Sequence, residues 1–269
     1  MTLTIGIINI MPKAHEYVPY LLDTFCAERP HVKPAWIRLA THGYRSTPEH
    51  HLKQYRAWSD LRPETLDGLI LTGAPVEHLP FESVTYWPEL TGILDDAARH
   101  GIPLLGICWG GMVAAHRMGV APVVYDRKCF GVYGAASHGV NVSGNPDGTF
   151  RCAQSRFAGL DRASLERAAA TGNARLIADG PGCGPFIVES TDRLLLAHLG
   201  HMECPAIRLA EEYYRDLEAG RDDVDRPHGM DPESPHMTWL PHRQAFVGRW
   251  METLELARVV RRGRAEVAR

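Results

Sequence analysis

A long hydrophobic run is missing from this sequence, and so is an excess of charge of either sign. No apolar stretch approaches the roughly 20 residues that a membrane helix needs. The 29 Lys and Arg residues nearly balance the 32 Asp and Glu residues, for a net charge of −3, which leaves no basic footprint for a nucleic acid. Residues Met1–Thr4 run directly into a strand-like segment, and we expect no signal peptide. We therefore expect a protein that binds neither membranes nor nucleic acids.

Cysteine is sparse, and its spacing excludes the usual cysteine frameworks. The six cysteines form no C-x-x-C pair and no zinc-like pattern. None of the 14 histidines forms a pair at helical spacing with a carboxylate, so we expect no metal site and no bound cofactor. A chain of this length needs no disulfides, and a reducing cytoplasm is the simpler assumption. The cysteines are Cys26, Cys108, Cys129, Cys152, Cys183 and Cys204.

Length and composition are those of a globular protein. The chain has 269 residues, of which 45% are hydrophobic and 23% charged, and this is enough for one large α/β domain. We expect a single domain over residues 1–269. The segment 220–241 is rich in Pro, Asp, Gly and His, which predicts an ordered loop excursion there.

Apolar runs alternate with segments of helical spacing along the first part of the chain. This alternation predicts a doubly wound, mostly parallel sheet with helices on both faces. After Gly119 the pattern turns to strand and loop, and the polar segment 151–161 is predicted as a loop, while 261–264 is predicted as a frayed basic tail. The expected strands are 3–11, 34–39, 67–75 (ending in a tight turn) and 102–107, and the expected helices are 17–27, 87–100, 206–217 and 244–261.

The pattern Gly106-x-Cys108-x-Gly110 stands between an apolar run and a helix-like stretch. It is typical of a nucleophile elbow, in which a strand turns sharply into a helix and holds the nucleophile at the turn. Glycine suits such a turn because a Cβ would obstruct it. The helix N-terminus favours a thiolate, and the N–H of Trp109 can point at an oxyanion. A buried structural cysteine is the competing interpretation, because free cysteines usually have that place.

A second apolar run ends in the pattern His201-x-Glu203. Residues two apart on a strand face the same side, so both side chains are expected to project together from one strand end. A cysteine nucleophile needs a base, and the base needs an orienting carboxylate. Two polar residues in a solvent-facing loop are the alternative. His198 is interpreted as a strand residue without a catalytic role.

Polar and glycine-rich segments follow several predicted strands. Parallel sheets carry their sites at the carboxyl ends of the strands. Residues 10–13, the turn 72–75, Cys108 and the segment 201–203 all lie at such ends. This convergence is stronger evidence for an active site than any of the motifs alone.

Motifs spread over nearly the whole chain carry a family resemblance. They include 8–13 (INIMPK), 45–50 (RSTPEH), 128–133 (KCFGVY), 155–157 (SRF), 200–203 (GHME) and 211–216 (EEYYRD). Together they resemble the homoserine O-acyltransferase family of methionine biosynthesis, of the trans-succinylase and trans-acetylase type. The resemblance implies a class I glutamine-amidotransferase-like fold, with acyl-CoA as a co-substrate and no nucleic-acid or membrane partner. A homodimer is left open.

The resemblance assigns roles to individual residues. It implies that Cys108 takes the acyl group as a thioester, with His201 as the base and Glu203 as its supporting carboxylate. The oxyanion would be held by the N–H of Trp109 and by an N–H near Gly73–Ala74, for which we take Ala74.

Three further positions match the substrate-binding residues of the family: Lys128, Ser155 and Arg215. A cationic pair such as Lys128 and Arg215 suits the carboxylate of an amino acid. Without the resemblance, each would be interpreted as a solvated surface cation.

The residue Glu77 matches the position with which the family selects its acyl group. A glycine there goes with succinyl and a glutamate with acetyl, because a carboxylate fills space and repels a second carboxylate on the acyl chain. The resemblance therefore implies acetyl-CoA as the donor. A capping or surface glutamate is the alternative.

The chain departs from the family pattern at a few positions, and these departures concern the acceptor. Ala153-Gln154 stands where the family has Pro-His, and the family's Gly-His-Pro-Glu-Tyr is Gly-His-Met-Glu-Cys here. Because we expect these positions near the amino-acid pocket, L-serine stays a competitor of L-homoserine as the acceptor. Two different functions also stay open: a glutaminase that feeds ammonia to a partner, and a non-catalytic binding protein on the same fold.

Overall fold

One ten-stranded sheet forms the centre of the molecule in the computed structural model, which describes residues 2–267. Its strand order is β3-β2-β1-β4-β5-β10-β9-β8-β6-β7. Neighbours from β3 to β10 pair in parallel, and neighbours from β10 to β7 pair antiparallel. The strands are β1 (Leu3–Ile8), β2 (Val32–Arg38), β3 (Arg56–Ala57), β4 (Gly68–Leu71), β5 (Leu104–Ile107), β6 (Pro122–Ser137), β7 (Thr149–Leu160), β8 (Ala174–Gly180), β9 (Gly184–Ser190) and β10 (Leu195–His198).

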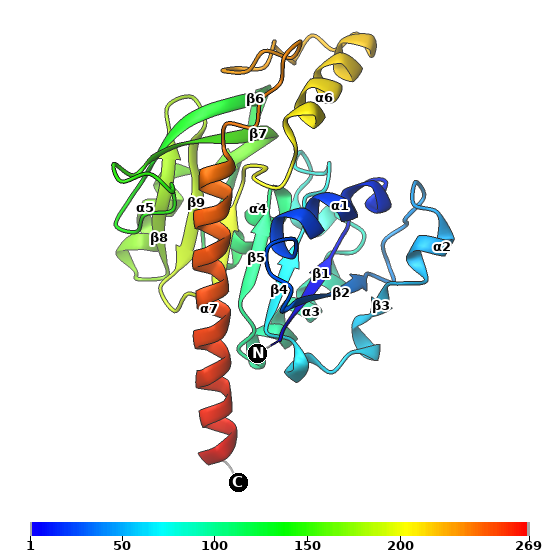
Figure 1. Cartoon of the computed structure of the whole chain (residues 1–269), viewed down its shortest axis with the longest axis vertical. Helices are drawn as coiled ribbons and strands as arrows, with labels where there is room; N and C mark the ends of the chain where they lie inside the picture. Colours follow the sequence, from blue (N-terminus) through cyan, green and yellow to red (C-terminus); the bar gives the residue numbers. More distant parts are fainter. Residues whose placement is uncertain (1, 268–269) are drawn as a thin grey trace.

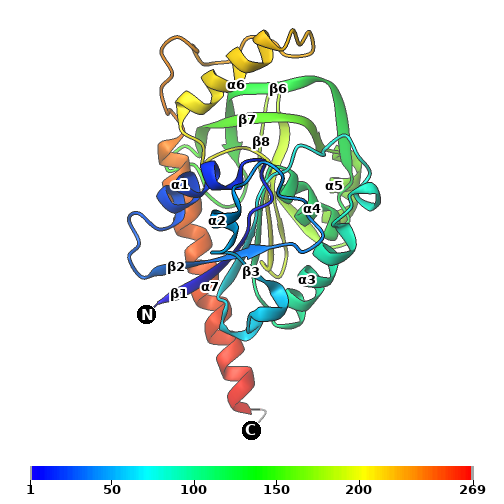
Figure 2. The ribbon, with the colours of Figure 1, turned by 90° about the vertical axis from the view of Figure 1, so that its right-hand side faces the viewer.

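Helices cover both faces of the parallel half of this sheet. Figure 2 shows α1 and the long α7 on one side, with α3 and α4 on the other. Helices α1 and α7 touch through Phe25 and Trp250, whose ring centroids lie 5.7 Å apart. The helices are α1 (Ala14–Phe25), α2 (Glu49–Leu52), α3 (Trp87–Arg99), α4 (Trp109–Arg117), α5 (Arg162–Ala170), α6 (Ala206–Glu218) and α7 (Leu240–Val267), with short 3-10 turns at Trp58–Asp60, Pro63–Thr65 and Phe81–Ser83.

The central strands are apolar along their whole length because helices cover both of their faces. Every residue of β4 and β5 is buried, as is typical of parallel strands between two layers of helices. The predicted doubly wound, mostly parallel sheet with helices on both faces is thus confirmed. Among the described residues, no helix combines the length and the apolar character of a membrane span.

Two predictions about local structure are wrong. The segment 151–161 is not a loop, because β7 runs through it and pairs with β6 along most of its length. Its polar side chains misled the periodicity argument: Arg156 is fully buried and its Nε donates to Gln154 Oε1 at 2.8 Å. The basic segment after residue 260 is not a frayed tail either, since α7 continues through it and Arg261 Nη1 donates to the carbonyl of Leu66 at 2.8 Å.

The upper part of the molecule in Figure 1 holds α6, the β6–β7 hairpin and the segment that leads to α7. This segment, 219–239, forms neither a helix nor a strand of its own. It is fastened to β6 at His228, whose N–H donates to the carbonyl of Phe130 at 2.9 Å and whose carbonyl accepts from the N–H of Val132 at 2.7 Å. These elements lie at the end of the molecule toward which the carboxyl ends of the central parallel strands point.

Candidate active site

The predicted elbow is present between β5 and α4. Cys108 has φ 53° and ψ −114°, a backbone conformation that residues other than glycine seldom adopt. The two flanking glycines are needed for steric reasons: a Cβ on Gly106 would lie 2.0 Å from the carbonyl oxygen of Gly110, and one on Gly110 would lie 2.2 Å from that of Leu71. The turn therefore exists only with glycine at both positions, and it holds the thiol at the start of a helix.

The side chains of His201 and Glu203 are in contact as expected, but they do not lie on a strand. The strand β10 ends at His198, so both residues lie beyond it in an irregular segment, and the argument from alternating strand positions is wrong. The N–H of His201 donates to the carbonyl of Ala153 at 2.8 Å, which fixes the segment against β7. There the Nδ1 of His201 lies 2.7 Å from Glu203 Oε1.

Tyr17 on α1 is part of this arrangement, and sequence reasoning missed it. Its hydroxyl donates to the same Glu203 Oε1 that faces His201. Burial raises the pKa of Tyr17 well above its usual range, and the charge of Glu203 adds to this effect, so the hydroxyl stays a donor. No spacing in the sequence links Tyr17 to Glu203, because they are 186 residues apart.

The charges of this group favour an ionised imidazole. Burial lowers the pKa of His201, but the neighbouring Cys108 and Glu203 outweigh burial and raise the pKa well above its ordinary value. Burial likewise opposes ionisation of Glu203, yet the charge and hydrogen bond of His201 and the hydrogen bond from Tyr17 keep its pKa below the ordinary value. The imidazolium of His201 thus pairs with the carboxylate of Glu203 and lies close enough to Cys108 for this sulfur to raise its pKa.

Cys204 is a second thiol in the same surroundings. It donates to Glu203 Oε1 at 3.6 Å. Burial raises its pKa to about 11, and the charge of Glu203 contributes to the rise. This thiol stays protonated at neutral pH, unlike a nucleophile, which must ionise.

Lys128 and Ser155 converge on a carboxylate that sequence reasoning did not single out. Glu212 Oε1 accepts from Lys128 Nζ and from the Ser155 hydroxyl, each at 2.7 Å. Lys128 Nζ also donates to Asp216 Oδ2 at 2.7 Å, so the buried cation is already paired. Burial opposes ionisation of Glu212, but the charge of Lys128 outweighs it and lowers the pKa of that carboxyl. The helical spacing of Glu212 and Asp216 within the EEYYRD motif was the available signal.

Arg215 lies at the rim of this network. Its side chain is 58% exposed, and its Nη2 lies 3.0 Å from Asp216 Oδ1 and 3.6 Å from Glu212 Oε1. An exposed guanidinium of this kind is free to turn toward an incoming carboxylate, whereas Lys128 is held in place.

A single cavity of about 560 Å³ joins these groups. Glu77 lies on its wall and is half-buried, and its Oε1 accepts from the N–H of Phe157 at 3.0 Å. The departing pair Ala153-Gln154 does not line the cavity, contrary to expectation, because Gln154 points into the core toward Arg156. The lining includes Gly73, Ala74, Glu77, Cys108, Lys128, Ser155, Phe157, His201, Cys204, Glu212, Arg215 and Asp216.

The turn that carries Gly73 and Ala74 lies beside Cys108, and Trp109 follows Cys108 directly. A Cβ on Gly73 would come within 3.1 Å of Cys108 Cβ, so the turn after β4 is packed against the nucleophile. Among the described residues, neither the N–H of Ala74 nor that of Trp109 donates a hydrogen bond. Two free N–H groups next to a thiol are what an oxyanion hole requires.

Comparison with solved structures extends the fold assignment. The chain is similar to a glutamine amidotransferase from Thermotoga maritima, with a TM-score of 0.62 and 14% identity over 96% of this chain and 98% of that one. It is also similar to a glutamine amidotransferase from Methylobacillus flagellatus, with a TM-score of 0.56 and 17% identity over 97% of this chain and 94% of that one. These likenesses confirm the expected class I glutamine-amidotransferase-like fold.

Comparison with protein families and curated relatives identifies the chain more closely. The model of the homoserine O-succinyltransferase family matches residues 1–257. The homoserine O-acetyltransferase of Geobacillus kaustophilus is 33% identical over 258 residues, which are 93% of this chain and 84% of that protein. That of Chelativorans sp. (strain BNC1) is 32% identical over 261 residues, 93% of this chain and 81% of that one. The chain therefore belongs to the homoserine O-succinyltransferase family, and it is an acyltransferase.

Proposed function

We propose that this protein transfers an acetyl group from acetyl-CoA to L-homoserine through an acyl-Cys108 intermediate, as a cytoplasmic step of methionine biosynthesis. One observation carries the proposal. A single cavity is lined by a thiol at an elbow, by the imidazole of His201, which is backed by the buried carboxylate of Glu203, and by a network of charges suited to an amino acid. The two halves of the reaction use the two sides of this cavity.

In the first half, Cys108 attacks the thioester carbonyl of acetyl-CoA as a thiolate. The negative charge that develops on the carbonyl oxygen accepts hydrogen bonds from the N–H groups of Trp109 and Ala74. The carbon–sulfur bond to CoA then breaks, and the imidazolium of His201 gives its proton to the leaving CoA sulfur. The products are free CoA, an acetyl thioester on Cys108 and a neutral imidazole.

Acylation itself prepares the second half. The charge of Cys108 is among the causes that raise the pKa of His201, and it disappears when the thioester forms. The neutral His201 then accepts the proton of the homoserine hydroxyl while the oxygen attacks the acyl carbon. The carbon–sulfur bond breaks, and the thiolate–imidazolium pair is restored. Glu203, held by Tyr17, keeps the imidazole in the orientation that both steps need.

The opposite wall of the cavity suits the charges of the acceptor. An amino acid carries a carboxylate and an ammonium group. The exposed Arg215 suits the carboxylate, and Lys128 adds positive charge from its fixed place between Glu212 and Asp216. Glu212, which also accepts from Lys128 and Ser155, adds negative charge near the ammonium. Homoserine is preferred to serine because the family match extends over nearly the whole chain. Of the departures that leave serine open, Ala153-Gln154 does not line the cavity, whereas Cys204 does.

The carboxylate of Glu77 supports acetyl over succinyl as the donor. A succinyl group would bring a second carboxylate into the same cavity, where repulsion between like charges costs binding energy. The hydrogen bond from the N–H of Phe157 holds Glu77 in place, so the side chain does not simply swing away.

The deciding experiment measures CoA release with acetyl-CoA or succinyl-CoA as the donor and homoserine or serine as the acceptor. We expect the highest kcat/KM for acetyl-CoA with homoserine, and one acetyl group on Cys108 when no acceptor is present. Preference for succinyl-CoA would overturn the donor, and a serine value ten times that of homoserine would overturn the acceptor. Hydrolysis of glutamine without acyl transfer would instead support a glutaminase.

A further inference from the structure

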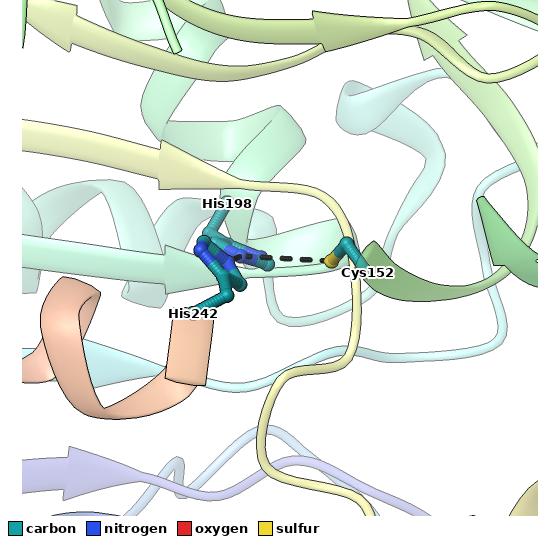
Figure 3. Close-up of side chains that lie close together, drawn as sticks. All are labelled: Cys152, His198 and His242. Carbon is teal, nitrogen blue, oxygen red and sulfur yellow. Dashed lines mark hydrogen bonds between the residues drawn. The ribbon is translucent and has the colours of Figure 1, made fainter. Parts of the chain in front are cut away.

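Three side chains from distant parts of the chain meet behind the active site. Cys152 lies on β7, His198 is the last residue of β10, and His242 lies in the first turn of α7; their exposed fractions are 0%, 0% and 1%. Cys152 Sγ and the Nε2 atoms of both histidines point toward one another (Figure 3). All three potential ligand atoms lie within 4.8 Å of each other.

The hydrogen bonds of the two imidazoles fix where their protons lie. His198 Nδ1 is 3.0 Å from the carbonyl of Gly200, and His242 Nδ1 is 2.6 Å from the carbonyl of Val142. A carbonyl oxygen only accepts, so each Nδ1 carries a proton. In the neutral rings each Nε2 atom then carries a lone pair and no proton, and the two Nε2 atoms face each other at 3.0 Å. Such an arrangement needs a positive centre between them.

The surroundings offer no such centre. No carboxylate bonds to either ring among the described residues, and the walls are aromatic: Phe150 stacks on His242 with centroids 4.1 Å apart, and Phe246 lies 4.8 Å from His198. The thiol of Cys152 lies 3.5 Å from the carbonyl of Ala153, to which it can donate, and 4.0 Å from His198 Nε2, so its one proton satisfies at most one of the two lone pairs. An unpaired charge in such a place is costly.

We propose that Cys152, His198 and His242 bind one thiophilic metal ion, Zn²⁺ or Cu⁺, through Sγ and the two Nε2 atoms. Thiolate and imidazole are the ligands that both ions prefer. Zn–N bonds of about 2.0–2.1 Å and a Zn–S bond of about 2.3 Å at tetrahedral angles place the two nitrogens about 3.3 Å apart and the sulfur about 3.5 Å from each. The observed nitrogen–nitrogen distance is 3.0 Å, the distance from Sγ to His198 Nε2 is 4.0 Å, and that from Sγ to His242 Nε2 is within 4.8 Å, so the sulfur must move inward to bind. Binding converts the thiol into a thiolate and releases its proton to solvent.

The hydrogen bonds on the far side of both imidazole rings also match a metal site. Histidine ligands usually donate their other N–H to a carbonyl or carboxylate, which fixes the ring, and both rings do so here. A surface hollow lined by His242, Ser143 and Phe150 gives an ion a way in. The sequence predicted no metal site because the three residues come from separate strands and a helix and form no local motif.

The ion would act on the reaction through position and not through contact with substrate. The carbonyl of Gly200, which His198 holds, belongs to the residue directly before His201, and the carbonyl of Ala153, next to Cys152, accepts the N–H of His201. A metal ion at this place would fasten β7, β10 and α7 together and steady the segment that carries the proposed base.

The test uses the full-length protein, purified without chelators, and measures bound metal by elemental analysis. We expect one Zn²⁺ or Cu⁺ per chain, with the element identifying which ion is bound. After the metal has been removed, titration with Zn²⁺ or, under reducing conditions, with Cu⁺ should restore one bound ion per chain and raise the Tm of the metal-free protein. Replacement by Co²⁺ should give a thiolate-to-cobalt charge-transfer band.

Variants locate the site. Cys152→Ser and His242→Gln should weaken binding by more than about a hundredfold, because even partners outside the ligand set are worth 10- to 100-fold. Cys183→Ser is the matched control, since this cysteine is also buried and its thiol also donates to a backbone carbonyl, but it is not grouped with the two histidines. Wild-type protein that neither contains nor takes up either ion would overturn the proposal, as would a Cys183→Ser variant that loses the ion equally. The wild-type titration keeps the test decisive even if a ligand variant fails to fold.

Discussion

Cys108 differs from its neighbour Cys204 in backbone and in chemistry, although both line the same cavity. If Cys108 carries the acyl group, Cys108→Ser should lose acetyl labelling and CoA release almost completely. Cys204→Ser should still be labelled at Cys108, because the Cys204 thiol has a pKa of about 11 and stays protonated. Mass spectrometry of the protein after incubation with acetyl-CoA alone gives the answer. Labelling of Cys108→Ser at Cys204 would refute the assignment.

Glu203 acts on His201 in two ways, by orienting the ring and by raising its pKa. Glu203→Gln should therefore lower turnover by a factor of roughly 10²–10⁴. It should also move the alkaline limb of kcat/KM for acetyl-CoA to lower pH. The sign follows from the proposed mechanism: its first half uses the imidazolium, which loses its proton at a lower pH once the neighbouring negative charge is gone. An unchanged pH profile together with full activity would remove Glu203 from the mechanism.

Charge and volume at Glu77 can be separated by two substitutions. Glu77→Gly removes both, and we expect it to gain turnover with succinyl-CoA and to lose its preference for acetyl-CoA. Glu77→Gln keeps the volume and the acceptor for the N–H of Phe157 but removes the charge. If repulsion dominates, Gln should gain succinyl turnover as well. The ratio of kcat/KM for acetyl-CoA to that for succinyl-CoA, measured by CoA release, gives the donor preference of each variant. A wild-type preference for succinyl-CoA would contradict the proposed role of Glu77.

Helix α6 presents Glu212, Arg215 and Asp216 to the part of the cavity that we propose binds the acceptor. Arg215→Ala should raise the acceptor KM far more than it slows thioester formation on Cys108, since the acceptor enters only the second half-reaction. Arg215→Lys is the matched variant: it keeps the positive charge and loses the bidentate fork, so its KM should lie in between. Equal loss in both half-reactions would show that α6 is merely structural.

The junction of β5 and α4 depends on backbone contacts that leave no room for a methyl group. Gly110→Ala would bring its Cβ to 2.2 Å from the carbonyl oxygen of Leu71. We expect it to lower the free energy of unfolding by about 1–3 kcal/mol or more, the usual cost of overpacking. Gly92→Ala on α3 is the control, because its Cβ meets nothing within 4 Å and should stabilise the helix by about 0.5–1 kcal/mol. Urea unfolding of both variants measures the difference.

The whole molecule is built on one continuous sheet, in which the parallel and antiparallel halves meet at β10 and β9. This continuity supports the prediction of a single domain. We expect one cooperative unfolding transition, with tryptophan fluorescence and far-UV circular dichroism changing together. Two separate transitions would instead divide the chain near this junction.

Sequence reasoning was most accurate where structure depends on neighbouring residues. The elbow could be predicted because a strand, two glycines and a helix start lie within a few positions. The strand β7 could not, since its buried polar residues Gln154 and Arg156 satisfy each other and so resemble a loop. The same holds at the end of β10, where a contact with β7, and not strand alternation, sets the direction of His201.

By itself, the sequence determined the apolar runs of the parallel sheet, the elbow at Cys108 and the set of residue types that the chemistry needs. These follow from local sterics and from the burial of apolar surface, which act over a few residues. Only the tertiary structure decided that Tyr17 holds Glu203, that Glu212 joins Lys128 to Ser155, and that Cys152 faces two histidines. Their separations of up to 186 residues are bridged by the order and register of the strands, which no local pattern encodes.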